Sequence, residues 1–174
     1  MRTDVNARVL TFYPHARGFA YALFEGDRPV DWGISDLRGE RLSQPLIQRL
    51  SRLLDHGDPD VVVLRKVKSA TAYRRSAALQ EAMCDLARTK GISSLAISRK
   101  QIREAFSDLG TPTRQAIAEA IVETVPLFAA FLPPRRKIWN GEDRRMALFD
   151  ALALIFAYRA TLNAGSSISS ILEA

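Results

Sequence analysis

The sequence has few of the residues that build disulfide frameworks and zinc sites. Its 174 residues include one cysteine and two histidines. A lone cysteine cannot form an internal disulfide, and Cys84 stands in a helical pattern of apolar residues, so we expect it to be buried. No apolar run approaches 18 residues, and the N-terminus has no basic-then-apolar signal pattern. These absences predict a cytoplasmic protein without a zinc site or a membrane partner.

What the chain does have is an unevenly placed positive charge. The net charge is +6. Residues 1–60 carry 8 basic and 9 acidic side chains, and residues 106–174 carry 7 of each, whereas residues 61–105 carry 10 basic and 3 acidic ones. Clustered Lys and Arg are typical of proteins that bind the phosphate backbone of nucleic acids, although a solvated basic face has the same composition.

The order of strand and helix patterns predicts one α/β domain. Strand-forming runs separated by turn residues predict a three-strand meander over residues 8–13, 19–25 and 29–34. Apolar runs at 60–64 and 94–97 predict two further strands. Helical periods cover residues 43–54, 74–90, 99–106, 113–125 and 142–162. Hairpins followed by crossovers predict a mixed five-stranded sheet with helices on both faces. We expect residues 1–164 to form this domain and residues 165–174 to be a flexible tail.

Four segments of the chain stand in an order and spacing that one family of proteins shares. They are VLTFYPHARGFAYALF (9–24), PDVVVLRKVKSA (59–70), SRKQIREAFSDLGTPTRQAIAEAI (98–121) and ALFDALALIFAY (147–158). In this order they resemble the first hairpin, the fourth strand, the segment after strand five and the last helix of the RuvC-type Holliday junction resolvases, which belong to the ribonuclease H-like superfamily. The resemblance implies a ribonuclease H-like fold, which by itself does not establish an activity.

Resolvases of this family hydrolyse phosphodiesters with two divalent ions held by carboxylates, and the resemblance shows where those acids should stand. The aspartate of strand one falls on Tyr13, and the glutamate of strand four falls on Arg65. Of the two acids on the last helix, the earlier falls on Ala147 and the later is Asp150. The resemblance therefore implies that the metal site is degenerate and that no cofactor is bound. We expect the Arg65 guanidinium to stand in the place of a metal and to pair with Asp150, or else to point outward.

Other acids could form a rebuilt site. Glu142 and Asp143 precede Asp150, and an active enzyme would hold Mg²⁺ or Mn²⁺ with these three residues. Asp143 lies seven residues before Asp150, which places both on one helix face about 10 Å apart. Acids in the first turn of a helix also complement its dipole, and we expect that role for Glu142 and Asp143.

Basic and aromatic residues give the predicted nucleic-acid contacts. The segment 65–75 resembles a loop that contacts DNA in the family, and Tyr73 within it is suited either to stack on a base or to anchor the loop. Trp32 and Trp139 are expected to pack in the interior. The predicted contact residues are Arg65, Lys66, Lys68, Tyr73, Arg74, Arg75, Arg99, Lys100, Arg103, Arg114, Arg135, Arg136 and Lys137.

The sequence thus predicts a resolvase-like domain that binds nucleic acid but lacks the usual two-metal nuclease activity, with branched or structured DNA as the expected ligand. One alternative is a metal-dependent endonuclease with rearranged carboxylates. Another is a protein-interaction scaffold that dimerises through the helix at 74–90. A homodimer is expected from the resemblance, since a four-way junction presents two symmetric cuts.

Overall fold

The computed structural model describes residues 7–38, 42–67, 74–137, 139 and 141–172, and from residue 165 onward the backbone alone. Lys68 and Tyr73, two of the predicted contact residues, lie outside the described residues. The strands are β1 (Arg8–His15), β2 (Gly18–Glu25), β3 (Arg28–Asp36), β4 (Val61–Arg65) and β5 (Ser93–Ile97). The helices are α1 (Gln44–Gly57), α2 (Arg74–Thr89), α3 (Arg99–Ala105), α4 (Arg114–Thr124) and α5 (Met146–Leu172), with short 3-10 turns η2 (Ser107–Leu109) and η3 (Pro126–Phe131).

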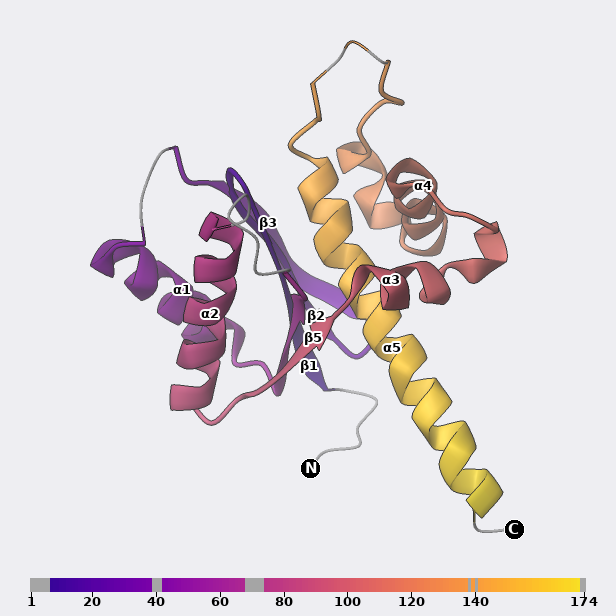
Figure 1. Cartoon of the computed structure of the whole chain (residues 1–174), viewed down its shortest axis with the longest axis horizontal. Helices are drawn as coiled ribbons and strands as arrows, with labels where there is room; N and C mark the ends of the chain where they lie inside the picture. The colour runs from indigo at the N-terminus through magenta and orange to yellow at the C-terminus, as the bar shows by residue number, and fades with distance from the viewer. Residues whose placement is uncertain (1–6, 39–41, 68–73, 138, 140, 173–174) are drawn as a thin grey trace.

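The five strands form one mixed sheet in the order β3-β2-β1-β4-β5. The meander pairs β1 with β2 and β2 with β3 in antiparallel fashion, while β4 runs parallel to both β1 and β5. Helices α1 and α2 cover one face, and α3, α4 and α5 lie on the other (Figure 1). The predicted fold class is confirmed.

Alternation along the strands divides the core into two layers. On β1, Leu10 and Phe12 pack toward α1 and α2, whereas Val9 and Tyr13 pack toward α5. Successive side chains of a strand point to opposite faces of the sheet, so this parity decides which residues can meet the last helix. On β4, Val63 belongs to the α5 side, and Arg65, two residues later, has the same parity.

The last helix is the core helix of the domain. Its segment Met146–Ala164 has a mean hydropathy of 1.3 and is by length and composition able to cross a membrane, but 56% of that window is buried inside the protein. The helix packs against β1 and β2, and Leu148, Leu152 and Ile155 are almost fully buried. The apolar composition of α5 is therefore explained by its contact with the sheet.

The bounds of α5 differ from the prediction at both ends. The helix begins at Met146 rather than at residue 142, and it continues to Leu172 rather than ending at residue 162. Glu142 and Asp143 consequently lie before the helix, so they neither occupy its first turn nor share a helix face with Asp150 as predicted. In the turn that leads into α5, the backbone amide of Arg145 instead donates to the Asp143 side chain at 2.9 Å.

Candidate nucleic-acid interface at the carboxyl edge of the sheet

The site begins where the parallel strands β1 and β4 end. Phe12 is paired with Leu64 in the register, so Tyr13 and Arg65 follow side by side on the face that α5 covers. The Arg65 Nη1 donates to the Tyr13 hydroxyl at 3.1 Å, and the Arg65 guanidinium lies 5.0 Å from the centroid of the Tyr13 ring. Burial, with a further contribution from the charge of Asp150, raises the pKa of Tyr13 above its usual value. The two positions that the resemblance assigns to metal-binding acids thus hold a neutral phenol and a cation in contact with each other.

Asp150 projects from α5 into the same region and is paired with Arg114, the first residue of α4. The Arg114 Nε lies 3.1 Å from Oδ1 of Asp150, and Nη2 bonds to Oδ2. The third nitrogen of the same guanidinium is paired with Glu142. Burial by itself would lower the pKa of Arg114. The hydrogen bond and the charge of Asp150 outweigh burial and raise this pKa above its usual value.

The prediction that Arg65 pairs with Asp150 is therefore wrong. A guanidinium does neutralise Asp150, but it belongs to Arg114. Arg114 reaches the carboxylate because α4 packs along α5, and the Thr113 hydroxyl caps α4 by accepting from the amide of Ala116 at 3.1 Å. Arg65 is instead held by Tyr13 on the neighbouring strand. The alternative that Arg65 points away from the site is also not observed, since it lines the same hollow as Asp150.

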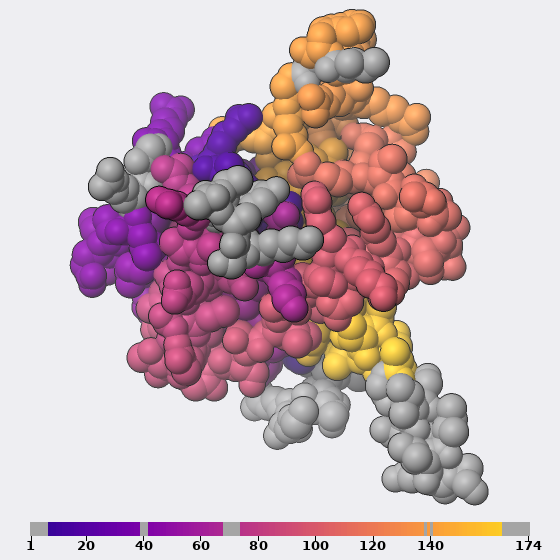
Figure 2. All heavy atoms as spheres, in the orientation of Figure 1, coloured from indigo at the N-terminus to yellow at the C-terminus, as the bar shows by residue number. Residues whose placement is uncertain are grey.

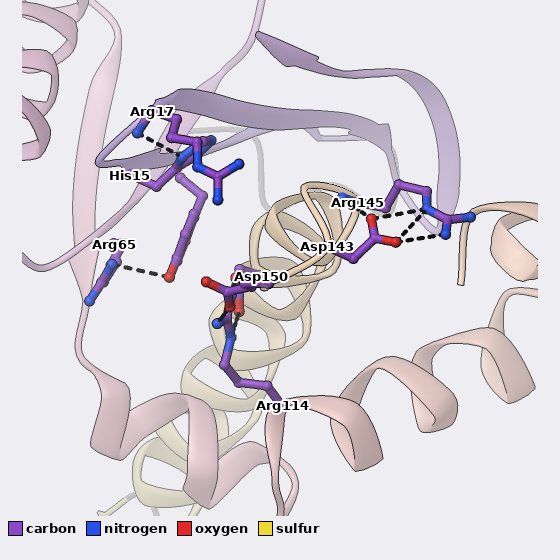
Figure 3. A network of polar contacts seen from close by, with 9 residues as sticks. His15, Arg17, Arg65, Arg114, Asp143, Arg145 and Asp150 are labelled. Atoms are coloured by element: carbon purple, nitrogen blue, oxygen red, sulfur yellow. Dashed lines mark hydrogen bonds and ion pairs between the residues drawn. The ribbon is translucent and has the colours of Figure 1, made fainter. Parts of the chain in front are cut away.

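The acids near this edge are held by basic side chains. Asp143 is held by Arg145, whose Nη2 lies 2.7 Å from Oδ2, and Figure 3 shows this pair set apart from Asp150. Within the part of the chain that the structure describes, no group of three or more His, Cys, Asp or Glu side chains is placed to hold a metal ion. Both oxygens of Asp150 accept from a guanidinium, and a cation rather than an acid stands at position 65. These described residues do not fit the pair of divalent ions that the resemblance implies.

A cleft surrounds these side chains at the carboxyl edge of the sheet. It consists of two adjoining hollows of about 240 and 360 Å³, which share Tyr13, Arg65, Arg99 and Arg114. The charged lining is dominated by guanidinium groups. The arginines are Arg17, Arg65, Arg99, Arg103, Arg114 and Arg144, and the acids are Glu142, Asp143 and Asp150.

Several of these arginines have no carboxylate partner among the described residues. Arg114 and Arg144 are paired, the latter with Asp36 at 2.9 Å, but no ion pair engages Arg17, Arg99 or Arg103. These three side chains belong to exposed residues, and the Arg65 side chain hydrogen-bonds to the neutral Tyr13 rather than to a carboxylate of the described residues. The cleft therefore presents cationic groups that are free to bind an anion.

Other predicted contact residues have structural partners instead. Arg75 is half-buried and its Nη1 donates to the carbonyls of Ala16 and Leu37, at 3.2 and 3.3 Å. Lys100 is paired with Glu104 at 3.6 Å. Lys66 and Arg74 are exposed, and Arg74 lies beside an apolar hollow between α1 and α2 rather than in the cleft.

The loop between η3 and α5 carries a second basic cluster. Arg135 is paired with Glu119 of α4 through two bonds of 2.9 and 3.0 Å, and Arg136 is exposed. The Lys137 ammonium lies 5.8 Å from the centroid of the Trp139 ring. Trp139 is 79% exposed, so the expectation that it packs in the interior is wrong. Trp32, in contrast, packs edge-on against Phe128 at 5.1 Å.

Sequence reasoning missed the contribution of the first hairpin. His15 and Arg17 lie at the turn between β1 and β2 and line the cleft (Figure 3). Burial lowers the pKa of His15, with Asp36 and Asp150 acting in the opposite direction. A signal was available, because a turn that follows β1 lies at the same edge as the end of the parallel strand β4. Arg144 and its partner Asp36 could not be found in this way, since they lie 108 residues apart in sequence.

Comparison with known proteins gives likenesses in structure only. No model of a known protein family matches the chain, and no curated protein matches it. RuvC of T. thermophilus in complex with Holliday junction substrate matches with a TM-score of 0.67 at 12% identity, over 91% of this chain and 96% of that one. The yeast mitochondrial Holliday junction resolvase Ydc2 matches with a TM-score of 0.62 at 15% identity, over 88% and 78%.

The fowlpox virus Holliday junction resolvase is a third structure of this kind. It matches with a TM-score of 0.56 at 12% identity, over 89% of this chain and 99% of that one. At such identities the likeness concerns the arrangement of the backbone, and the three structures agree on it. The chain has the ribonuclease H-like fold of the Holliday junction resolvases, as its sequence motifs predicted.

Proposed function

We propose that this protein binds nucleic acid, with branched or structured DNA as its ligand, and that its cleft holds phosphate groups with arginines instead of metal ions. One observation carries the proposal. At the edge of the sheet where the resemblance expects metal-binding acids, the residues are the Arg65–Tyr13 contact and an Asp150 carboxylate engaged by Arg114. Such a site has no ligand set for a divalent pair, yet it retains a surplus of guanidinium groups.

The chemistry of the cleft favours phosphate over other anions. A guanidinium presents several donors in a plane and binds phosphate oxygens through parallel hydrogen bonds. Arg17 comes from the turn between β1 and β2, and Arg99 and Arg103 lie one turn apart on α3, so together they are suited to successive phosphates of a strand. Binding that rests on phosphate contacts does not need the carboxylates that hydrolysis requires.

The test compares two double variants that lose the same charge. Arg99→Ala with Arg103→Ala removes two cations of the cleft, whereas Arg52→Ala with Arg88→Ala removes two exposed cations from α1 and α2. Labelled four-way junction, duplex and single strand are titrated with the full chain at several salt concentrations, and the shifts are measured in gels. The cleft variant should bind about tenfold more weakly and lose about 2 from the slope of log K against log salt, since each phosphate contact releases about one counterion. The control variant should bind as the wild type does.

Metal-dependent cleavage is measured in the same series, with Mg²⁺, Mn²⁺ or chelator. One observation favours the rival function of a rearranged endonuclease: Glu142 and Asp150 both bind Arg114, so their carboxylates face one point. A product that requires metal and disappears in Asp150→Asn would establish that rival and overturn the arginine-site proposal. Binding without cleavage supports the proposal.

Two further expectations belong to this proposal. We infer a cytoplasmic protein and a homodimer, the latter because a four-way junction offers two equivalent surfaces. Light scattering on the purified protein, with and without junction, measures its mass. Weak binding that does not depend on salt, together with a stable dimer, would favour the protein-interaction scaffold instead.

A further inference from the structure

The loop between η3 and α5 carries an aromatic side chain that the core does not use. Trp139 is 79% exposed, more than any other large hydrophobic residue among those described. An indole buries a large apolar area when it packs, so leaving it in solvent forgoes a substantial stabilisation. The loop projects from the body of the molecule at the top of Figure 2. Its one tryptophan is therefore placed for contact with a ligand rather than for folding.

The root of this loop is fixed to the body of the domain. The Gln115 Nε2 donates to the carbonyl of Pro133 at 3.3 Å, and Pro133 is itself buried. Arg135, two residues after Pro133, donates two hydrogen bonds to the Glu119 carboxylate of α4. Helix α4 thus holds the start of the loop at two points, and a fixed base lowers the entropy lost when the loop binds something.

A groove connects the loop with the cleft. A hollow of about 540 Å³ lies beneath the loop, lined by Pro134 and Arg136 on one side and by α4 on the other. Arg114, Glu142 and Asp143 line both this hollow and the cleft. A nucleic-acid strand with phosphates in the cleft can accordingly continue along one surface as far as Arg136, three residues before Trp139.

From these observations we propose that Trp139 stacks on a nucleobase whose face is free, while Lys137 beside it contacts the adjoining phosphate. The inference rests on the proposed nucleic-acid binding and adds the part of the ligand that this loop recognises. The flat, exposed indole matches the face of any base, and the Lys137 ammonium 5.8 Å from the ring supplies the neighbouring positive charge. Bases within a duplex have their faces covered by stacking, so the ligand must offer a base with a free face, as single strands and the open centre of a branched junction do.

The first measurement uses the fluorescence of Trp139 itself. The chain has two tryptophans, and Trp32→Phe leaves Trp139 as the single reporter while keeping an aromatic ring against Phe128 and Phe131. Oligo-dT, a four-way junction and a blunt duplex of equal length are added at low salt. We expect the single strand and the junction to quench the emission and the duplex to leave it nearly unchanged.

The second measurement uses gel shifts with an otherwise unaltered chain. Trp139→Ala should weaken binding of single strand and junction about tenfold, with little effect on duplex, and Trp139→Phe should restore most of the loss. Leu127→Ala is the matched control, because Leu127 is 54% exposed but lies on η3. It should bind as the wild type does.

The outcomes separate this inference from the function on which it rests. If the wild-type protein binds no nucleic acid at any salt concentration, the proposed function fails and this inference fails with it. If the protein binds, but the emission stays constant and Trp139→Ala binds normally, only the role of Trp139 is overturned. Quenching by anionic phospholipid vesicles without quenching by DNA would overturn it as well, in favour of a membrane surface.

Discussion

The cleft and the loop over residues 133–139 are both rich in cations, yet the fold uses these cations differently. In the cleft, Arg114 neutralises Asp150 and Arg65 is packed on Tyr13. In the loop, Arg135 fixes the base of the segment and Lys137 stands beside an exposed indole. The difference teaches that a basic residue is available to a ligand only where the tertiary structure has not supplied it with an acid.

The largest effect is expected from the tight backbone at the rim of the cleft. A Cβ on Gly18 would lie 1.9 Å from the carbonyl oxygen of Ser35, so Gly18→Ala forces β2 and β3 apart next to His15 and Arg17. We expect the free energy of unfolding to fall by about 3 kcal/mol in urea denaturation. In the segment that leads from the loop to α5, a Cβ on Gly141 meets nothing within 4 Å, and Gly141→Ala should change stability by less than about 0.5 kcal/mol. Equal effects at both glycines would remove the contrast between a rigid cleft rim and an open loop.

A smaller effect is expected from the ion pair inside the cleft. Arg114→Met leaves the Asp150 carboxylate, whose side chain is 15% exposed, without its two donors. Because Arg114 itself is 40% exposed, water compensates in part, and we expect a loss of about 1–2 kcal/mol in the free energy of unfolding. Adding Asp150→Leu should recover much of the loss, since the carboxylate that then remains without its partner, Glu142, is 49% exposed and solvated.

Arg135 provides the control for that experiment. Because the Arg135 side chain is 81% exposed, Arg135→Ala should leave the thermal midpoint unchanged within error. The side-chain hydrogen bond of Arg135 lowers the pKa of Glu119, and NMR titration of the variant should return that pKa toward its usual value. If Arg114→Met is as harmless as Arg135→Ala, the Arg114–Asp150 pair is no more than a surface contact.

The smallest effect concerns the protonation of His15 at the cleft. Burial holds the pKa of His15 below its usual 6.5, and its Nε2 is buried without a hydrogen-bond partner in the described part of the chain. The unfolded chain therefore binds more protons below pH 6.5, so the free energy of unfolding should fall as the pH drops through 6.5 and level off below the folded pKa. His15→Gln should flatten this slope around pH 6.5. An unchanged slope in His15→Gln would mean that His15 does not titrate differently on folding.

Local patterns were sufficient to predict most of the fold. Turn residues and β-branched runs place β1 to β5 within one or two residues of their observed bounds, because strand alternation and turn chemistry depend on near neighbours. The start of α5 was misplaced by four residues, since the acids at 142 and 143 fit a helix N-terminus by composition. In the structure Arg114 and Arg145 engage these acids, and no rule of local composition contains those partners.

The sequence by itself determined the strand order of the meander and the strand alternation that turns Tyr13 and Arg65 toward α5. It also determined that acids are missing at Tyr13, Arg65 and Ala147, the positions that the resemblance marks. Only the tertiary structure decided that Asp150 meets Arg114, 36 residues away, and that Trp139 remains in solvent while Trp32 is packed. The physical reason is that strand parity follows from backbone geometry, whereas the partner of a charge and the burial of an indole depend on how α4 and α5 pack together.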